Sequence, residues 1–415
     1  MNSSKEKSLL KNTAFLYILT FSNYLFSLIT LPYETRVLGP EYFGILGFAA
    51  AFYSYFYIIF DFGFILCGTK KITENINNHN ALERIVSGIT FAKILLFLIT
   101  AVIFSIVCFS VNQLKEYFVI LFLYLIYAAL TCLIPDYLYR GLENMKMITY
   151  RTLLVRFIFT CLIFVFLKQP EQVYLIPLFN IIGSICALGW VYYDIKHHLH
   201  ISIRRVPLTY IWFLISESFV YFISRIASTI YGATNMVILG FLYPAGNILG
   251  YFTSVDKIRG LASQAASPIA DSFYPYMLRT KDYRKMFRIS FIMELIMLVG
   301  CVFLWIFAKE FCTIVFGSDY ENAGEILRYI LPLMALILPN YMLGFPSLSP
   351  IGMAKWANHS VVIAMINQII GIIILFSLNK ISVYSIILVT ITSELLCLLV
   401  RVVVFVKVFK SYKHV

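Results

Sequence analysis

The chain has 415 residues, of which 60% are hydrophobic and only 13% are charged, and its formal net charge is +12. Its mean hydropathy of +0.84 is too high for a soluble domain that must keep its surface hydrated. The composition therefore excludes a water-soluble globular protein and indicates an integral membrane protein.

Twelve apolar stretches are each close to the roughly 20 residues needed to cross about 30 Å of hydrocarbon. In chain order they occupy residues 9–31, 43–66, 85–109, 117–138, 152–167, 173–193, 208–240, 248–275, 287–307, 326–346, 359–378 and 382–406. The connections between them are short and leave no room for a soluble catalytic or nucleotide-binding domain. The sequence therefore predicts an all-α membrane protein with twelve transmembrane helices.

Lysine and arginine are concentrated in the N-terminus, the C-terminal tail and every second connection. These segments hold Lys5, Lys7, Lys11, Lys70, Lys71, Arg84, Arg140, Lys146, Arg151, Lys196, Arg204, Arg205, Arg279, Lys281, Arg284, Lys285, Arg288, Lys355, Lys407, Lys410 and Lys413. The other connections hold only Arg36, Lys115, Lys168, Lys309 and Lys380. Short basic connections stay in the cytoplasm during insertion, so both termini are predicted to be cytoplasmic. Because the cations are dispersed, a nucleic-acid partner is disfavoured.

Motifs for several other functions are missing from the sequence. There is no GxxxxGK[ST] phosphate-binding loop and no D-x-D pair, which removes a built-in ATPase motor and weakens a metal-dependent glycosyltransferase. The eight cysteines are scattered and form no CxxC, so neither a metal site nor a disulfide framework is indicated. We therefore expect a transporter without a cofactor, and keep a membrane enzyme or an assembly factor as alternatives.

Polar side chains recur at helical spacing in the first two predicted spans. Asn23, Ser27, Thr30 and Glu34 fall on one side of the first helix. In the second span Asp61 begins the run Asp61-Phe62-Gly63-Phe64, and a buried aspartate there requires a partner.

The seventh and eighth spans repeat this pattern more strongly. The seventh carries Ser218, Arg225, Thr229 and Gly232 on one stripe, with Glu217 beside it. Two neighbouring faces of the eighth are polar and are expected to line water: Lys257, Gly260, Gln264, Pro268 and Asp271, and then Asp256, Arg259, Ser263, Ser267 and Tyr274. Helix packing is the alternative for the small residues, and an ion pair between Asp256 and Arg259 could be structural.

Other ionisable residues in the spans have different expected roles. Four cations lie where they can extend to the membrane interface, so they are predicted to be anchors: Lys93, Arg156, Arg328 and Arg401. For Glu294 and Glu394 either a structural or a functional role is open. The similar polar pairs of spans, and a short echo of Val37-Leu38-Gly39 in Ile238-Leu239-Gly240, predict two lobes at 1–205 and 206–415.

Several motifs in order along the chain resemble the Wzx-type flippases of O-antigen and capsule repeat units, in the multidrug/oligosaccharidyl-lipid/polysaccharide exporter superfamily. They are Leu38-Gly39-Pro40-Glu41-Tyr42-Phe43-Gly44, Asp61-Phe62-Gly63-Phe64, Tyr139-Arg140-Gly141-Leu142-Glu143-Asn144-Met145-Lys146, Gly250-Tyr251-Phe252 with Asp256-Lys257-Ile258, and Phe316-Gly317-Ser318-Asp319-Tyr320. Two departures limit the transfer of roles: Asn235 stands where the echo would place the counterpart of Glu34, and the usual glutamine-rich motif after the fourth helix reads Tyr139-Arg140 here.

The resemblance implies two six-helix lobes around a central cavity in the bacterial inner membrane, and no enzyme activity. The implied cargo is an oligosaccharide on undecaprenyl pyrophosphate, carried from the cytoplasmic to the outer leaflet. Membrane lipid, a polysaccharide polymerase and a chain-length regulator are candidate partners. The candidate cavity residues, which would bind the anionic headgroup or the sugar, are Arg225, Lys257, Arg259, Arg36 and Gln264.

The candidate coupling residues are acids that could change charge as access alternates, with a proton or sodium as the coupling ion: Glu34, Asp61, Glu217, Asp256 and Asp271. Tyrosines including Tyr53, Tyr57 and Tyr231 are candidates for stacking on sugar rings. A drug or cation exporter of the same fold is the first rival function, and it would favour a site dominated by acids.

Overall fold

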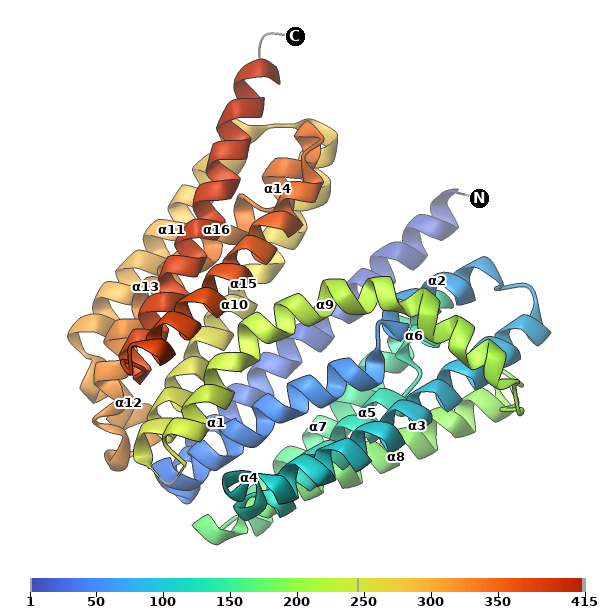
Figure 1. Ribbon diagram of the computed structural model, residues 1–415. Helices are drawn as coiled ribbons and strands as arrows, with labels where there is room; N and C mark the ends of the chain where they lie inside the picture. The colour runs from blue at the N-terminus through green and yellow to red at the C-terminus, as the bar shows by residue number, and fades with distance from the viewer. Residues whose placement is uncertain (1, 245, 413–415) are drawn as a thin grey trace. The chain divides into compact units, whose positions relative to one another are not determined.

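The computed structural model describes residues 2–244 and 246–412, which form helices joined by short turns (Figure 1). Helix α1 (Asn2–Asp61) leaves helical geometry at Gly39, where φ is 66°. It is followed by α2 (Phe64–Glu74), α3 (His79–Ser110), α4 (Asn112–Glu116), α5 (Phe118–Leu133), α6 (Asp136–Gly141), α7 (Met145–Phe166), η1 (Pro170–Tyr174) and α8 (Leu175–His197).

The second half of the chain continues with two long helices, α9 (Leu208–Leu242) and α10 (Asn247–Thr280). They are followed by α11 (Tyr283–Ile306), α12 (Ala308–Phe316), η2 (Ser318–Tyr320), α13 (Ala323–Met342), α14 (Phe345–Leu348), η3 (Ser349–Ile351), α15 (Ala354–Ser377) and α16 (Val383–Tyr412). Residues 2–244 and 246–412 therefore contain only helices and turns, as the sequence predicts.

Nine helices or helical runs in the described part of the chain are long and apolar enough to cross a membrane. They are Ile18–Glu74, His79–Ser110, Phe118–Gly141, Met145–Phe166, Pro170–His197, Tyr283–Ile306, Ala323–Ile351, Ala354–Ser377 and Val383–Val408. The predicted span at 43–66 and residues 18–31 of the span at 9–31 fall within one run, Ile18–Glu74. The spans at 208–240 and 248–275 lie in α9 and α10, outside the nine. The count of twelve stays a prediction.

The chain forms two compact units. The first contains Met1–Leu38 and Leu46–Thr229, and the second contains Gly39–Ile45 and Ile230–Val415. The chain therefore passes from one unit to the other inside α9, and the short segment around the Gly39 break belongs to the second unit. The division into lobes 1–205 and 206–415 concerns the two sets of six helices and stays a prediction.

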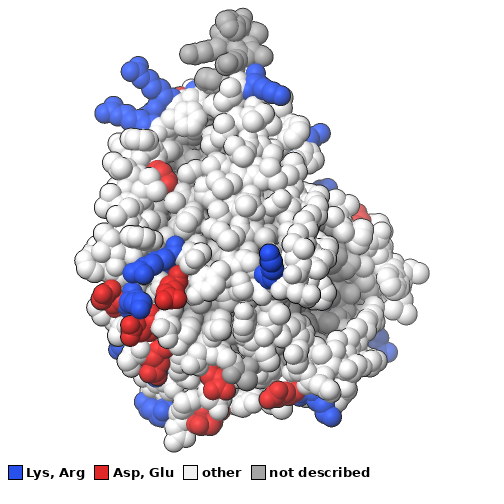
Figure 2. Space-filling model, turned by 60° about the vertical axis from the view of Figure 1, so that its left-hand side comes forward, with Lys and Arg blue, Asp and Glu red and all other residues white. Residues whose placement is uncertain are grey.

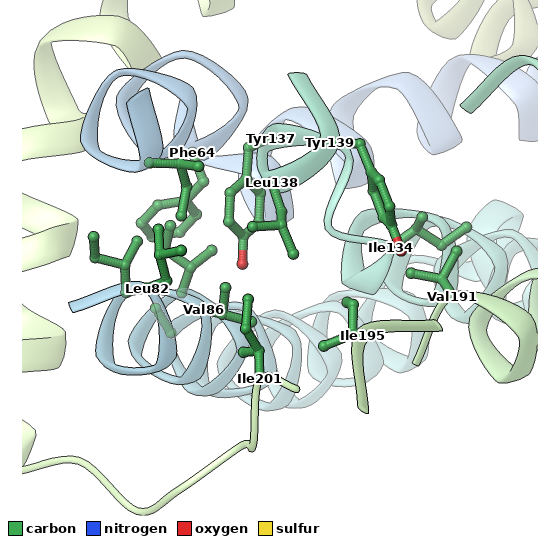
Figure 3. Packing of buried hydrophobic residues seen from close by; sticks show 14 of the residues in the cluster. Phe64, Leu82, Val86, Ile134, Tyr137, Leu138, Tyr139, Val191, Ile195 and Ile201 are labelled. Atoms are coloured by element: carbon green, nitrogen blue, oxygen red, sulfur yellow. The ribbon is translucent and has the colours of Figure 1, made fainter. Parts of the chain in front are cut away.

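A core of aliphatic and aromatic side chains holds the first unit together. Phe64, Val86 and Leu138 are each at most 1% exposed and pack between α2, α3 and α6, as Figure 3 shows. Burial of such side chains is the main favourable contribution where two helices meet in water, whereas in lipid close packing provides it. This cluster fixes α6 against α2, and so fixes the short helix that contains Asp136.

Two glycines allow a close crossing in the second unit. A Cβ atom added to Gly250 on α10 would lie 1.8 Å from the Pro40 carbonyl oxygen, and one on Gly44 would lie 2.7 Å from the Gly250 nitrogen. Phe43 and Tyr251 both pack against Tyr320 of η2, with ring centroids 6.5 and 5.9 Å apart. The Leu38–Gly44 motif and the Gly250-Tyr251-Phe252 motif therefore meet.

Helices α3 and α11 illustrate the apolar outer surface. On α11, Phe291, Ile296 and Val299 are 71%, 62% and 63% exposed, and α3 likewise exposes Val102 and Ile106. Figure 2 shows that most of one face of the molecule carries no charged side chain. Large apolar surfaces of this kind are stable in contact with lipid and not in water.

Candidate functional site

The Asp61-Phe62-Gly63-Phe64 motif forms the break between α1 and α2. Phe62 and Gly63 have positive φ angles of 42° and 80°, so the backbone turns sharply after Asp61. A Cβ atom on Gly63 would lie 2.7 Å from Tyr221 Cβ and 2.8 Å from the Ser218 carbonyl oxygen. Glycine is therefore required here both for the turn and for the close approach of α9.

This approach brings Asp61 and Arg225 together. The rings of Phe62 and Phe222 stack with centroids 4.4 Å apart, and Arg225 lies one helical turn beyond Tyr221 and Phe222 on α9. Its Nη1 donates a hydrogen bond to Asp61 Oδ2. Asp61 is only 2% exposed, so this ion pair satisfies a charge that would otherwise be costly inside the helices.

A second ion pair joins α2 to α9 about two helical turns before Arg225. Lys71 Nζ bonds Glu217 Oε2, and the same ammonium lies over the ring of Phe213 at 4.9 Å from its centroid. The Glu217 side chain is 41% exposed, and its pair is therefore screened more than that of Asp61. Two of the predicted coupling acids thus have basic partners in the first unit.

A polar cavity of about 440 Å³ lies inside the first unit. Tyr53 and Tyr127 stack along its wall with ring centroids 4.6 Å apart. Arg151 also lines it and donates from Nη1 to Asp136 Oδ1 at 2.7 Å. The remaining polar lining includes Asn23, Tyr57, Thr131, Arg156, Asn180 and Ser184. Phenol, amide and guanidinium groups on one wall can bind hydroxyl and anionic groups.

The second unit has its own polar cavity, of about 230 Å³, between α9, α10, α13 and α16. Arg259 Nε donates to Asp256 Oδ1 at 2.7 Å. The ion pair that the sequence analysis gives as an alternative is therefore formed, and both of its residues lie on α10. Glu394 lines the same cavity and accepts a 2.7 Å bond from Asn340 Nδ2. This cavity therefore combines one cation with two acids.

Neutral side chains form a network at the wall of this cavity. Asn235 donates from Nδ2 to Thr390 Oγ1 at 2.9 Å and accepts from Gln368 Nε2 at 2.8 Å. Ser393 in turn donates to Gln368 Oε1 at 3.1 Å. The network ties α9, α15 and α16 together without a charge.

The other predicted site residues are dispersed. Lys257 and Gln264 are exposed on α10 and are not among the residues that line these two cavities, whereas Asp271 lines a further cavity of the second unit. Glu34 is half-buried and Arg36 exposed on α1. The side chain of Tyr231 lies outside the described residues. Of the two polar faces predicted for α10, the one with Asp256, Arg259 and Ser263 lines the cavity.

Three buried cations differ from the sequence predictions. Lys93 is 4% exposed and donates to the Cys132 carbonyl at 2.6 Å, and Arg401 is 8% exposed, so neither is an interfacial anchor. The sequence places Arg151 in a polar connection, whereas in the structure α7 begins at Met145 and Arg151 is buried. Lys93 and Arg401 donate to backbone carbonyls of other helices, and Arg151 donates to Asp136 of α6. Residue spacing within one helix does not reveal partners on another element.

Sequence comparison identifies one protein family over most of the chain. Residues 9–281 match the family described as polysaccharide biosynthesis protein. A protein of Escherichia coli K12 named "Putative O-antigen transporter" is 28% identical over 352 residues, 81% of this chain and 82% of its own length. A protein of Shigella dysenteriae with the same name is 26% identical over 83% of this chain and 87% of its own.

Solved structures show the fold. The inward closed conformation of the lipid II flippase MurJ aligns with a TM-score of 0.71 and 12% identity, over 94% of this chain and 86% of that chain. An inward-facing multidrug resistance MATE transporter of the MOP superfamily aligns at 0.66 with 14% identity, over 94% and 95%. With the family match, these alignments confirm the resemblance seen in the motifs. The chain belongs to the polysaccharide biosynthesis protein family and has the fold of MOP-superfamily transporters.

Proposed function

We propose that this protein is a flippase that moves undecaprenyl-pyrophosphate-linked oligosaccharide from the cytoplasmic to the outer leaflet of the bacterial inner membrane, by alternating access of its two lobes. The cargo would be a repeat unit of O-antigen, capsule or a related surface polysaccharide. Family membership, the names of the relatives and the fold support transport of a lipid-linked saccharide.

The observation that carries the proposal is the polar interior of the first unit. Arg151, Asp136 and Asn180 line a cavity of about 440 Å³, and polar side chains around a cavity inside a membrane protein are typical of a space that water or a polar cargo enters. Stacked Tyr53 and Tyr127 offer the flat apolar surface on which sugar rings pack, and guanidinium groups suit phosphate oxygens. These features suit a glycan with an anionic headgroup.

Both the paired and the exposed candidate residues would contact the cargo or the coupling ion. Arg225 and Arg259 would release their acids to contact the headgroup, while Lys257, Arg36 and Gln264 would contact the cargo from exposed positions. The coupling proton or sodium would bind Asp61, Asp256 or Glu217 when its pair opens, with Glu34 and Asp271 as further candidates. Both termini would be cytoplasmic, with helices 1–6 in lobe 1–205 and helices 7–12 in lobe 206–415. The polymerase and the chain-length regulator would be partners.

Lipid analysis of cells that lack the protein tests the cargo. We expect undecaprenyl-pyrophosphate oligosaccharide to accumulate in the cytoplasmic leaflet, and the surface glycan to disappear. The wild-type gene should restore both. Normal surface glycan with retained drugs or cations would instead favour an exporter, a rival that the likeness to the MATE transporter supports on fold alone.

Variants at the paired cations then test the site. Replacing Arg259 with alanine should abolish surface glycan, whereas replacing Arg328, whose Nε donates to the Trp305 carbonyl on a neighbouring helix, should leave it intact. Both proteins should be present in the membrane at the wild-type amount. Normal glycan with the Arg259→Ala variant would remove this cation from the mechanism.

A further inference from the structure

Arg401 on α16 is a buried cation that the mechanism above does not use. It is 8% exposed. Its Nε donates to Ser360 Oγ at 2.8 Å, Nη1 to the Asn340 carbonyl, and Nη2 to the Ala357 carbonyl at 3.3 Å. Three of its five N–H groups are therefore bonded, and two are left for another acceptor.

No carboxylate of the described residues forms an ion pair with this guanidinium. The three groups that accept its hydrogen bonds, a hydroxyl and two backbone carbonyls, are all neutral. A guanidinium inside a helical membrane unit costs several kcal/mol when no anion is near it. An anion beside Arg401 would therefore be stabilising.

Arg401 lines a cavity that can hold such an anion. The cavity has a volume of about 390 Å³ and lies between α10, the α13–α14 turn and α16. At the turn, Gly344 lies against the guanidinium, and a Cβ atom there would be 3.4 Å from Arg401 Nη1. Glycine therefore keeps a side chain away from this cation, which lines the cavity.

The rest of the cavity wall is mainly aromatic and aliphatic. Tyr274 and Phe345 pack edge to face with centroids 6.1 Å apart, and Tyr341 stands beside them. One carboxylate, that of Asp271, lines the cavity and accepts a 3.1 Å bond from Ser267 Oγ, and it forms no ion pair with Arg401. One buried cation with an apolar wall is complementary to an anionic amphiphile and not to a small hydrated ion.

We propose that this cavity binds a lipid with a phosphate headgroup, the phosphate on Arg401 and the first part of the chain against Tyr274, Tyr341 and Phe345. The cavity adjoins that of Asp256 and Arg259, because Asn340 and Tyr341 line both, but Arg401 lines only this one. The proposal does not depend on the proposed flippase activity. Arg401 would recognise a phosphate group, and both a membrane phospholipid and a polyprenyl phosphate carry one.

Direct binding of farnesyl phosphate to the full-length protein in phosphatidylcholine nanodiscs tests the site. We expect saturable binding, at least about tenfold tighter than that of farnesol or of inorganic phosphate, because each lacks one half of the recognised structure. Competition by phosphatidylglycerol would assign the site to membrane phospholipid, and lack of competition would assign it to polyprenyl phosphate. Inorganic phosphate that binds as tightly as farnesyl phosphate would overturn the lipid assignment.

Matched variants locate the binding. Arg401→Gln should weaken farnesyl phosphate binding by about tenfold or more, while Arg328→Gln, which alters a cation outside the cavity, should not change it. Asp271→Asn should tighten binding severalfold, because it removes the negative charge of the cavity. If Arg401→Gln does not fold, Asp271→Asn decides. A folded Arg401→Gln protein with unchanged affinity, or Asp271→Asn with unchanged or weaker affinity, would overturn the proposal, whatever the surface glycan shows.

Discussion

The two compact units hold their interior charges in different ways. In the first unit, Asp61 pairs with Arg225 of a helix far along the chain, and Asp136 of α6 pairs with Arg151 of the next helix, α7. In the second unit, Asp256 and Arg259 lie three residues apart on one helix, and Arg401 bonds only neutral groups. Ion pairs therefore link different helices inside the first unit, whereas these two cations of the second unit bond within one helix or to neutral groups.

This difference separates stability from function. A pair between helices is lost only when the helices move, so its removal should destabilise the fold. A pair within one helix is retained when neighbouring helices move, so its removal should affect what the cavity binds. Surface glycan and thermal unfolding, measured on the same variants, test whether the two units follow this rule.

The largest effect on stability is expected at Asp61. Asp61→Ala leaves the guanidinium of Arg225 without its partner, and breaking a buried pair in this way costs about 3–5 kcal/mol. The unfolding temperature of the detergent-solubilised protein should fall sharply. It should partly recover in the Asp61→Ala/Arg225→Ala double variant, because no unpaired charge is then left.

Lys71→Ala is the matched control for this pair, since its partner Glu217 is 41% exposed and water can replace the lost bond. Equal unfolding temperatures of the Asp61→Ala and Lys71→Ala variants would contradict the expected difference between a buried and an exposed ion pair. The Asp61–Arg225 contact would then contribute no more than a surface ion pair.

The next largest effect is expected where the second unit packs backbone against backbone. Gly250→Ala places a methyl group where Pro40 allows only 1.8 Å, and such overpacking costs about 1–3 kcal/mol or more. Gly260→Ala on the same helix meets nothing within 4 Å, and should be neutral or slightly stabilising. Thermal unfolding of the two variants measures the difference, and equal values would mean that the crossing is not tight.

A smaller effect is expected in the neutral network. Asn235→Ala removes the bonds to Thr390 and Gln368, and hydrogen bonds between membrane helices contribute about 0.6 kcal/mol each, rarely above about 1.7. Ser377→Ala is the control, because Ser377 is exposed and bonds only the carbonyl of Ile373 on its own helix. A loss at Asn235 as large as that at Asp61 would contradict the proposed contrast between the units.

The sequence predicts the helices better than the partners. Hydropathy and spacing predict that Asp61 is buried and needs a partner, and that Asp256 and Arg259 share a face, because both statements concern one helix. The partner of Asp61 lies 164 residues away, and only the turn at Gly63 brings it near. Arg401 and Lys93 look like interfacial residues in the sequence because a helix pattern does not show which carbonyls of other helices face a side chain.

The smallest stability effect, with a large functional effect, is expected for Asp256→Asn. The two side chains of its pair are about one third exposed, at 33% and 31%, so the amide should cost only about 0.3–1 kcal/mol. The unfolding temperature should therefore stay close to that of the wild type. If Asp256 serves the cargo or the coupling ion, surface glycan should nevertheless be lost, and transport should no longer respond to the ion gradient. Transport that keeps its response to the gradient, together with a stable protein, would make the Asp256–Arg259 pair a purely structural feature of α10.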